Sequence, residues 1–354
     1  MQENILTFPH LPPDEEASLP KHHFPLPLTS LVGREHEVAE VCALLQRSEV
    51  RLLTLAGTGG VGKTRMALQV AADLPDDVAN EVYFVSLAFL SNPTLVMPLI
   101  AQLFGLVEKA DQSALAQLKV YLQDKHLLLV LDNFEQVVVA APLLVDLLQT
   151  CPHLKALVTS RILLHVRGEY EFFVPSLALP MLTSQDSKAL LQYEAVALFV
   201  QRVQSIQADF TMTDANAHVI VEICTRLDGL PLAIELAAAR MRLLSLQQLL
   251  ERLDHRLQVL TSGAHDLPER QQTLQKTLQW SYDLLSENEQ RLFRHLSIFV
   301  GGCTIEAVEA VCCVSGNGTT YLLDEIMSLL ENNLIYPKEQ SDGEQRLMML
   351  ETIR

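Results

Sequence analysis

The sequence of 354 residues has no long hydrophobic run. No stretch reaches the roughly eighteen consecutive apolar residues that a membrane-spanning helix requires. Its first residues, Met1-Gln2-Glu3-Asn4, lack the basic start and the apolar segment of a secretion signal. These absences argue against a membrane span and predict a cytoplasmic protein with no membrane partner.

A metal-type cysteine pattern and an excess of positive charge are also missing. The six cysteines lie scattered in apolar segments without a C-x-x-C pair, which favours buried reduced thiols. The 26 Lys and Arg residues face 43 Asp and Glu residues, so the formal net charge is −17. Because phosphate backbones are bound through clustered Lys and Arg, we predict no direct nucleic-acid binding by this stretch.

The length and the 49% hydrophobic content predict two or three domains with substantial cores. Proline and acidic residues at the start do not build a core, whereas three helical patterns and a hairpin pattern near the end are typical of a winged helix. From residue 263 onward, seven Lys or Arg stand against fourteen Asp or Glu, which argues against DNA binding there. The predicted segments are a Pro-rich flexible lead-in (1–28), a P-loop nucleotide-binding domain (29–176), a helical domain (177–262) and a winged-helix domain (263–354), the last possibly truncated.

One motif organises the chain, and it reads Gly57-Thr58-Gly59-Gly60-Val61-Gly62-Lys63-Thr64. It matches G-x-x-x-x-G-K-[ST], with an apolar strand pattern before it and a helix pattern after it. Such glycines let successive amide N–H groups converge on a phosphate at the start of a helix. We expect Lys63 to bind the β- and γ-phosphates of a nucleotide and Thr64 to coordinate Mg²⁺. The alternative is a glycine-rich turn that binds nothing.

A carboxylate follows the apolar run of residues 127–131, at the position Asp132. In doubly wound sheets, ligands bind at the carboxyl ends of the parallel strands, so Asp132 is predicted to hold Mg²⁺ directly or through water. The alternative is that Asp132 caps the next helix. The alternation of strand and helix patterns predicts an α/β fold, a P-loop NTPase with a doubly wound parallel sheet, followed by an α-helical domain and a winged-helix domain.

Hydrolysis of a bound nucleotide also requires a group that orients or deprotonates the attacking water. Asn133 can hydrogen-bond water but cannot accept its proton. Glu135 can accept it if the turn aims the side chain inward, and otherwise is an ordinary acid in the first turn of a helix. Arg161, after the strand pattern of 154–158, is either a γ-phosphate sensor or a surface arginine. The predicted catalytic set is Lys63, Asp132, Glu135 and Arg161.

Five motifs follow one another in the chain, namely Leu31-Val32-Gly33-Arg34-Glu35, the phosphate loop, Thr159-Ser160-Arg161, Gly229-Leu230-Pro231-Leu232-Ala233 and Trp280-Ser281-Tyr282-Asp283-Leu284-Leu285. Their order resembles the NB-ARC or STAND class of signalling NTPases, and the likeness covers nearly everything from residue 29 onward. Leu131-Asp132-Asn133-Phe134-Glu135-Gln136 is similar to bacterial members related to AfsR and LuxR-type regulators. The resemblance implies that the backbone near Gly33 contacts adenine and that Pro231 packs beside the nucleotide. The nucleotide-binding residues that we expect are Val32, Gly33, Arg34, Gly57, Thr58, Gly59, Gly60, Val61, Gly62, Lys63, Thr64, Asn133, Arg161 and Pro231, with Thr64 and Asp132 as Mg²⁺ ligands.

The resemblance implies an ATP/ADP-binding signalling switch. ADP would hold a resting state, and exchange for ATP would open the domains and drive self-association. The family's second Walker B position is commonly acidic and is Asn133 here, which implies at most a slow Mg²⁺-dependent ATPase. Similar regulators usually add helical repeats and often a DNA-binding module, so a sensor or effector module is expected to be missing or separate. The alternatives are a motor-like ATPase and a transcription factor that uses the winged helix.

Overall fold

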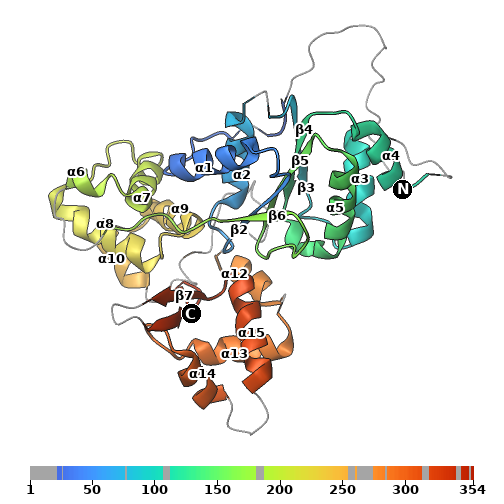
Figure 1. Cartoon of the computed structure of the whole chain (residues 1–354). Coiled ribbons are helices and arrows are strands. Elements are labelled where there is room, and N and C mark those ends of the chain that lie inside the picture. Colours follow the sequence, from blue (N-terminus) through green and yellow to red (C-terminus); the bar gives the residue numbers. More distant parts are fainter. Residues whose placement is uncertain are drawn as a thin grey trace, which may run out of the picture.

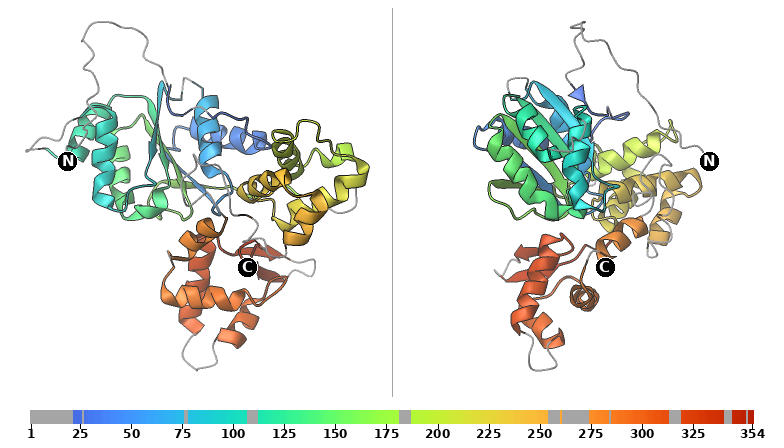
Figure 2. Two further views of the ribbon diagram at one scale, coloured as in Figure 1. Left: turned by 180° about the vertical axis from the view of Figure 1, so that it is seen from behind. Right: turned by 90° about the vertical axis from the view of Figure 1, so that its right-hand side faces the viewer.

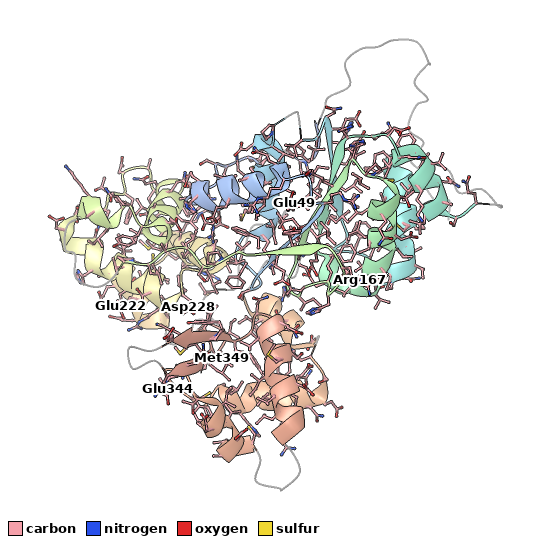
Figure 3. The ribbon with its side chains drawn as sticks, viewed as in Figure 1. Glu49, Arg167, Glu222, Asp228, Glu344 and Met349 are labelled. Atoms are coloured by element: carbon pink, nitrogen blue, oxygen red, sulfur yellow. The ribbon has the colours of Figure 1, made fainter. Side chains whose placement is uncertain are left out.

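The computed structural model describes residues 22–25, 27–75, 78–106, 112–180, 187–253, 260, 274–283, 285–312, 319–339, 344–350 and 352–354. The chain forms three parts (Figure 1), which are a sheet unit, a helical unit and a C-terminal unit of helices with a two-stranded ribbon. The C-terminal unit lies below the junction of the other two, as the view from behind also shows (Figure 2). The three parts therefore meet near the centre of the molecule, as the view with side chains also shows (Figure 3).

The sheet unit is built on a six-stranded sheet in the order β1-β3-β4-β5-β2-β6, in which every neighbouring pair is parallel. This confirms the predicted parallel α/β sheet of a P-loop ATPase. The strands are β1 (His22–His23), β2 (Leu52–Ala56), β3 (Glu81–Ser86), β4 (Leu127–Asp132), β5 (Leu154–Ser160) and β6 (Glu169–Phe173).

One strand falls where a flexible lead-in was predicted. His22 pairs with Val82 and His23 with Tyr83, and the His23 ring stacks on the Tyr83 ring at 4.5 Å between centroids. Residues 22 and 23 are thus part of the sheet, because unpaired backbone groups on the edge of β3 accept a further strand. Residues 1–21 and 26 of the predicted lead-in lie outside the described residues.

Helices cover both faces of the sheet because alternate residues of the buried strands point to opposite sides. In β4, Leu128 and Val130 face one core with helices α1 and α2, whereas Leu127, Leu129 and Leu131 face a second core with α3, α4 and α5. This explains why the sequence of β4 is an unbroken apolar run. The helices of the sheet unit are α1 (Glu35–Gln46), α2 (Lys63–Asp73), α3 (Val96–Leu103), α4 (Ala114–Leu122) and α5 (Ala141–Thr150), with short η1 (Pro93–Leu95), η2 (Phe134–Gln136) and η3 (Val138–Ala140).

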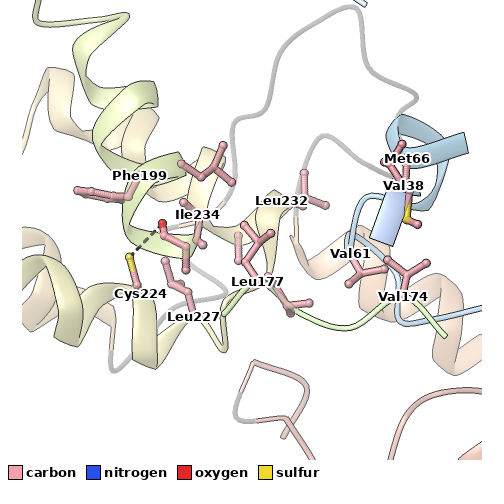
Figure 4. Packing of buried hydrophobic residues seen from close by; sticks show 14 of the residues in the cluster. Val38, Val61, Met66, Val174, Leu177, Phe199, Cys224, Leu227, Leu232 and Ile234 are labelled. Carbon is pink, nitrogen blue, oxygen red and sulfur yellow. Dashed lines mark hydrogen bonds between the residues drawn. The ribbon is translucent and has the colours of Figure 1, made fainter. Parts of the chain in front are cut away.

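The helical unit shares its hydrophobic core with one face of the sheet unit. Figure 4 shows Leu177 and Leu232 between Ile234 on one side and Val61 and Val174 on the other, and all five belong to one buried cluster. A common core resists separation of the two units, since opening it would expose apolar surface to water. The helices of this unit are α6 (Ser187–Leu190), α7 (Glu194–Gln204), α8 (Asp214–Arg226), α9 (Pro231–Ala239), η4 (Arg240–Arg242) and α10 (Leu246–Arg252).

The C-terminal unit has a core of its own, formed by residues that include Leu292, Val308 and Leu329. Ser286 caps one of its helices through a capping box with Glu289. The described residues of this unit form four helices and a two-stranded ribbon, whereas three helical patterns and a hairpin pattern are predicted from the sequence. The assignment as a winged helix stays a prediction. The elements are α12 (Leu274–Asp283), α13 (Glu287–Leu296), α14 (Ile305–Cys312), α15 (Thr319–Glu331) and the antiparallel strands β7 (Tyr336–Glu339) and β8 (Gln345–Met348).

Three general features of the described part of the chain complete the fold. None of its helices is both long enough and apolar enough to cross a membrane. Its residues form no group of three or more His, Cys, Asp or Glu side chains able to hold a metal ion. Its five cysteines are free thiols, and four of them are buried.

Candidate functional site

The glycine-rich loop of residues 57–62 joins the carboxyl end of β2 to the first residue of α2. Its φ angle is +84° at Gly60 and +98° at Gly62, a region that favours glycine. A Cβ atom on Gly60 would lie 3.0 Å from the Cβ of Leu232, so the loop is also tightly packed. The sequence and the packing together produce a concave loop at a helix N-terminus, which is a favourable site for an anion.

Lys63 lies inside this loop rather than in solvent. Its Nζ donates hydrogen bonds to the carbonyl oxygens of Gly57 at 2.6 Å and Thr58 at 3.1 Å. Burial lowers the pKa of Lys63 to about 8, an effect that the charges of Glu135 and Asp132 partly oppose. A poorly solvated ammonium group at a phosphate loop gains stability from an anionic ligand, and this fits the predicted role of Lys63.

Thr64 and Asp132 meet directly beside the loop. The Thr64 hydroxyl donates a hydrogen bond of 2.6 Å to Oδ1 of Asp132, and Thr159 Oγ1 donates another of 2.6 Å to the same oxygen. Burial raises the pKa of Asp132, whereas these two bonds act in the opposite direction. A hydroxyl and a carboxylate are hard oxygen donors, and Mg²⁺ commonly takes only one or two protein ligands beside water and phosphate oxygens. The pair therefore fits the predicted Mg²⁺ site.

The turn after β4 directs Glu135 inward. Asn133 adopts the left-handed conformation with φ of 63°, and the Glu135 side chain that follows is 1% exposed. Glu135 Oε1 accepts a hydrogen bond from Asn133 Nδ2 at 3.3 Å and lies 3.6 Å from Nε of Arg161. The buried Oε2 of Glu135 has no hydrogen-bond partner within the part of the chain that the structure describes. Glu135 is thus not a solvated acid on a helix surface. One carboxylate oxygen remains able to accept a proton or a water hydrogen bond.

Arg161 is also buried, and beside Glu135 it contacts two residues of the C-terminal unit. Its guanidinium group donates a hydrogen bond to the Ser281 hydroxyl, and its carbonyl oxygen accepts one from Asn333 Nδ2 at 2.5 Å. The backbone oxygen of Asn333 in turn accepts a hydrogen bond from Thr58 Oγ1 at 3.1 Å. Neither Ser281 nor Asn333 is predicted from the sequence as a site residue, although both lie at the predicted site.

The start of α9 abuts the phosphate loop from the helical unit. The amide of Leu232 donates a hydrogen bond of 3.2 Å to the carbonyl oxygen of Gly60. Pro231 is the first residue of α9, and its Cγ lies 4.0 Å from where a Cβ atom on Gly62 would be. The structure therefore brings Pro231 beside the loop, as a role next to a bound nucleotide requires.

The segment Val32-Gly33-Arg34 lies against the helical unit, and its contacts are structural. A Cβ atom on Gly33, whose φ is +58°, would overlap the side chain of Glu194 at the start of α7. The buried Arg34 side chain donates a hydrogen bond to the carbonyl oxygen of Pro175 at 2.5 Å, and Val32 packs on the shared core. Contact of this segment with an adenine base stays a prediction.

Arg65, two residues after Lys63, connects that segment to the phosphate-loop helix. Its guanidinium donates hydrogen bonds to the carbonyl oxygens of Thr29 at 2.7 Å and Ser30 at 2.9 Å. A cavity of about 510 Å³ lies on the outer side, between this segment, α1 and α2, and is lined by Arg34, Cys42 and Gln69 among others. The residues that line the cavity do not include the phosphate loop, but they include Arg34 of the predicted nucleotide-binding segment.

Comparison with known proteins assigns the chain to a family. Residues 30–164 match a family model described as an AAA ATPase domain. The uncharacterized protein Rv0894 of Mycobacterium tuberculosis is 35% identical over 315 residues, which cover 86% of this chain and 77% of that protein. The chain belongs to the family of this protein and contains an AAA ATPase domain. The matched residues 30–164 begin before α1 and end after β5, and they include the phosphate loop, Asp132, Glu135 and Arg161.

Two further similarities extend beyond the AAA ATPase domain. A longer protein of Mycobacterium tuberculosis, named "Putative HTH-type transcriptional regulator Rv0890c", is 39% identical over 305 residues. The match covers 86% of this chain and 33% of that relative. This chain therefore spans about a third of the relative's length. The solved structure of the Aeropyrum pernix ORC2 protein matches 90% of each chain with a TM-score of 0.50 and 13% identity, so it supports the fold alone.

Proposed function

We propose that this chain is an ATP/ADP-dependent signalling switch of the NB-ARC or STAND type. The observation that carries the proposal is that one phosphate loop contacts the other two units. The Gly60 carbonyl accepts a hydrogen bond from the amide of Leu232 in the helical unit, and the Thr58 hydroxyl donates one to the backbone oxygen of Asn333 in the C-terminal unit. A nucleotide bound at this loop would therefore affect how both units are held.

The residues at the loop have separate roles in this proposal. Lys63 binds the phosphates, Thr64 and Asp132 hold Mg²⁺, and Arg161 senses the terminal phosphate. The bound Mg²⁺ would neutralise charge on the phosphate oxygens. Pro231 and the backbone of residues 32–34 bind the adenosine end. In support, the Aeropyrum pernix ORC2 structure is described as ADPNP-ADP complexes, which shows that this fold accommodates adenine nucleotides in that protein.

In the ADP state, the three units stay closed, with the winged helix docked on the loop. Exchange for ATP opens them and exposes a surface for self-association. A ligand shifts such an equilibrium only by the difference in its affinity for the two states, so the docked contacts must distinguish ADP from ATP. The longer mycobacterial relative is named a transcriptional regulator, and this name supports a regulatory output. A separate sensor or effector module would read the signal.

Calorimetric titration with ADP and Mg²⁺ tests the proposal on the wild-type chain, Lys63→Ala and Lys119→Ala. Lys119 is the matched control because its ammonium group pairs with Asp146 on the opposite face of the sheet. We expect Lys63→Ala to bind at least about tenfold more weakly, since it loses a charged hydrogen bond to phosphate, and Lys119→Ala to bind like the wild type. Absence of measurable binding by the wild-type chain would overturn the proposal.

The second candidate function is a motor-like ATPase that turns over steadily, and the inward position of Glu135 favours it. Phosphate release under multiple-turnover conditions separates the two functions. Steady release at roughly 1 per second or faster, within the usual range of enzymes, supports the motor. Slow release together with tight ADP binding supports the switch. A role as a DNA-binding transcription factor has less support, because acidic residues exceed basic ones in the C-terminal unit.

A further inference from the structure

The C-terminal unit contains a cysteine and a histidine that meet outside the nucleotide site. Nδ1 of His295, in α13, lies 3.4 Å from Sγ of Cys312, the last residue of α14. The two residues are 17 positions apart, so their contact depends on the packing of α13 against α14. The nucleotide site uses neither residue. This pair of a nucleophile and a base therefore needs a separate explanation.

Cys312 differs from the other cysteines of the described chain in its access to solvent. Those four are buried, whereas Cys312 and His295 are partly exposed. Burial raises the pKa of each buried thiol, and at Cys303 the nearby charge of Cys312 raises the pKa further. A thiol that stays protonated is a poor nucleophile, because the thiolate is the reactive form. The buried cysteines are Cys42, Cys151, Cys224 and Cys303.

His295 lies where it can take the proton of the Cys312 thiol. In the tautomer that carries the ring proton on Nε2, Nδ1 is an acceptor and the thiol is a donor. Proton transfer gives a thiolate beside an imidazolium, the arrangement that activates cysteine nucleophiles. His295 is in the last turn of α13, and the negative end of that helix favours the imidazolium. The end of α14 disfavours a thiolate at Cys312, so the imidazolium partner is necessary.

We propose that Cys312 is a peroxide-sensitive thiol and that His295 is its base. The thiolate attacks hydrogen peroxide, an S–O bond forms and the O–O bond breaks, so that the sulfur loses two electrons and becomes a sulfenic acid. The leaving hydroxide takes the proton from the His295 imidazolium and departs as water. The imidazole is then neutral again. One thiol and one peroxide have become one sulfenic acid and one water.

Oxidation at this position affects the packing of the C-terminal unit. The Cys312 side chain packs on the core that includes Val308 and Leu329. A sulfenic acid adds a polar oxygen at the edge of this core, and a polar group that is removed from water without a partner costs free energy. The redox state of one thiol would therefore determine how firmly α13 and α14 pack together. This inference does not depend on nucleotide binding.

Trapping of the sulfenic acid tests the inference on the full chain with Cys313→Ser, which removes the adjacent thiol of the sequence. The reduced protein is treated with hydrogen peroxide and dimedone, and peptide mass spectrometry measures the adduct at each cysteine. We expect Cys312 to be labelled at least about tenfold faster than the buried cysteines. His295→Gln should slow this labelling about tenfold or more, since the base is lost. His218→Gln, at an exposed position of α8, is the control and should not slow it.

The direction of the His295→Gln effect separates activation of the thiol from packing. Removal of a residue that only packs would expose Cys312, which would then react equally fast or faster. That result, or equal labelling of Cys312 and the buried cysteines, would overturn the inference.

Thermal denaturation after peroxide treatment provides a second readout. Oxidation should lower the midpoint of the Cys313→Ser chain by about 3 °C or more, because a polar group enters the edge of the core. The same chain with Cys312→Ala should keep its midpoint. An unchanged midpoint after complete oxidation of Cys312 would overturn the effect on packing.

Discussion

Thr64 and Asp132 lie 68 positions apart in the chain, yet the Thr64 hydroxyl donates a 2.6 Å hydrogen bond to the Asp132 carboxylate. The sheet order produces this contact. β5 lies between β4 and β2, so the end of β4 is two strands away from the phosphate loop. Thr159 at the end of β5 fills the space between them and bonds to the same carboxylate oxygen. The oxygen donors for a divalent cation are thus already oriented.

Replacement of Asp132 by alanine should remove the effect of Mg²⁺ on nucleotide affinity. The wild-type chain should bind ADP more tightly with Mg²⁺ than with a chelator, because the carboxylate helps to hold the cation. Asp132→Ala should show less than about a tenth of that gain. Titration of a fluorescent ADP derivative in Mg²⁺ and in chelator measures the effect. Asp146→Ala is the control, because Asp146 is the half-exposed partner of Lys119. An equal increase of ADP affinity by Mg²⁺ in both variants would contradict the assignment of Asp132 as a Mg²⁺ ligand.

Nucleotide binding should take up a proton at alkaline pH. Burial lowers the pKa of Lys63 to about 8, and an anionic phosphate would raise it again. Between pH 8 and 9, part of the unliganded protein carries a neutral Lys63 that must be protonated on binding, so affinity should fall as pH rises through this range. Calorimetry in two buffers with different ionisation enthalpies counts the protons. Identical apparent enthalpies at pH 8.5 would contradict the expectation.

The same lowered pKa affects folding. The folded state disfavours the charged form of Lys63, so the unfolded chain binds more protons between pH 8 and about 10.4, the ordinary pKa of lysine. The contribution of Lys63 to stability therefore rises with pH across this window. Lys63→Met should flatten the rise. Urea denaturation at pH 8 and at pH 10, followed by circular dichroism, compares the two chains, and parallel pH profiles would show that Lys63 has no such effect.

Glu135→Gln should reduce any phosphate release by about a hundredfold or more, the usual loss when a general base is removed. The reason is the buried Oε2 of Glu135, which has no hydrogen-bond partner among the described residues. Glutamine keeps the shape but cannot accept the proton. Steady-state phosphate assays compare it with Glu171→Gln, which changes an exposed acid on β6. Retained turnover in Glu135→Gln would assign water activation to another group, while ADP affinity should stay within a few-fold.

Gly33→Ala should destabilise the protein more than Gly105→Ala. Both glycines have positive φ angles, 58° and 67°, so both substitutions carry a backbone cost of about 1 kcal/mol. At Gly33 the added methyl group also overlaps the Glu194 side chain, whereas at Gly105 it enters open space. Overpacking costs a further 1 to 3 kcal/mol, roughly, at such a site. Thermal denaturation measures the difference, and equal midpoints would contradict the packing at Gly33.

The sequence predicts the sheet and much of the site because their signals are local. The apolar run of β4 ends at a carboxylate, and parallel strands bring their carboxyl ends to one edge. This reasoning alone places Asp132 beside the phosphate loop and Arg161 at the same edge. The inward position of Glu135 depends on the left-handed conformation of Asn133, which asparagine permits but does not require. For that reason the sequence left two alternatives open for Glu135.

Other parts of the site have no local signal. His22–His23 contains no strand pattern, and its pairing depends on the free edge of β3. The sequence around Asn333 indicates only that this residue ends a helix, and the sequence around Ser281 indicates only a polar position on a helix. Their roles arise from how the C-terminal unit is placed on the phosphate loop, which is a property of the whole fold. The order of the five motifs indicates that distant parts of the chain converge on one nucleotide. It does not indicate which residues of the C-terminal unit contact the phosphate loop.

The contact between Thr58 and Asn333 also has a consequence for synthesis of the chain. The last strand of the sheet ends at Phe173, about 160 residues before Asn333. At a translation rate of roughly 5 to 20 residues per second, the sheet unit leaves the ribosome about 10 to 30 seconds before its partner. A newly made sheet unit can therefore capture a nucleotide from the cell before the C-terminal unit arrives. The nucleotide that binds during synthesis, and not one that binds to the finished chain, would then determine the first conformational state of the protein.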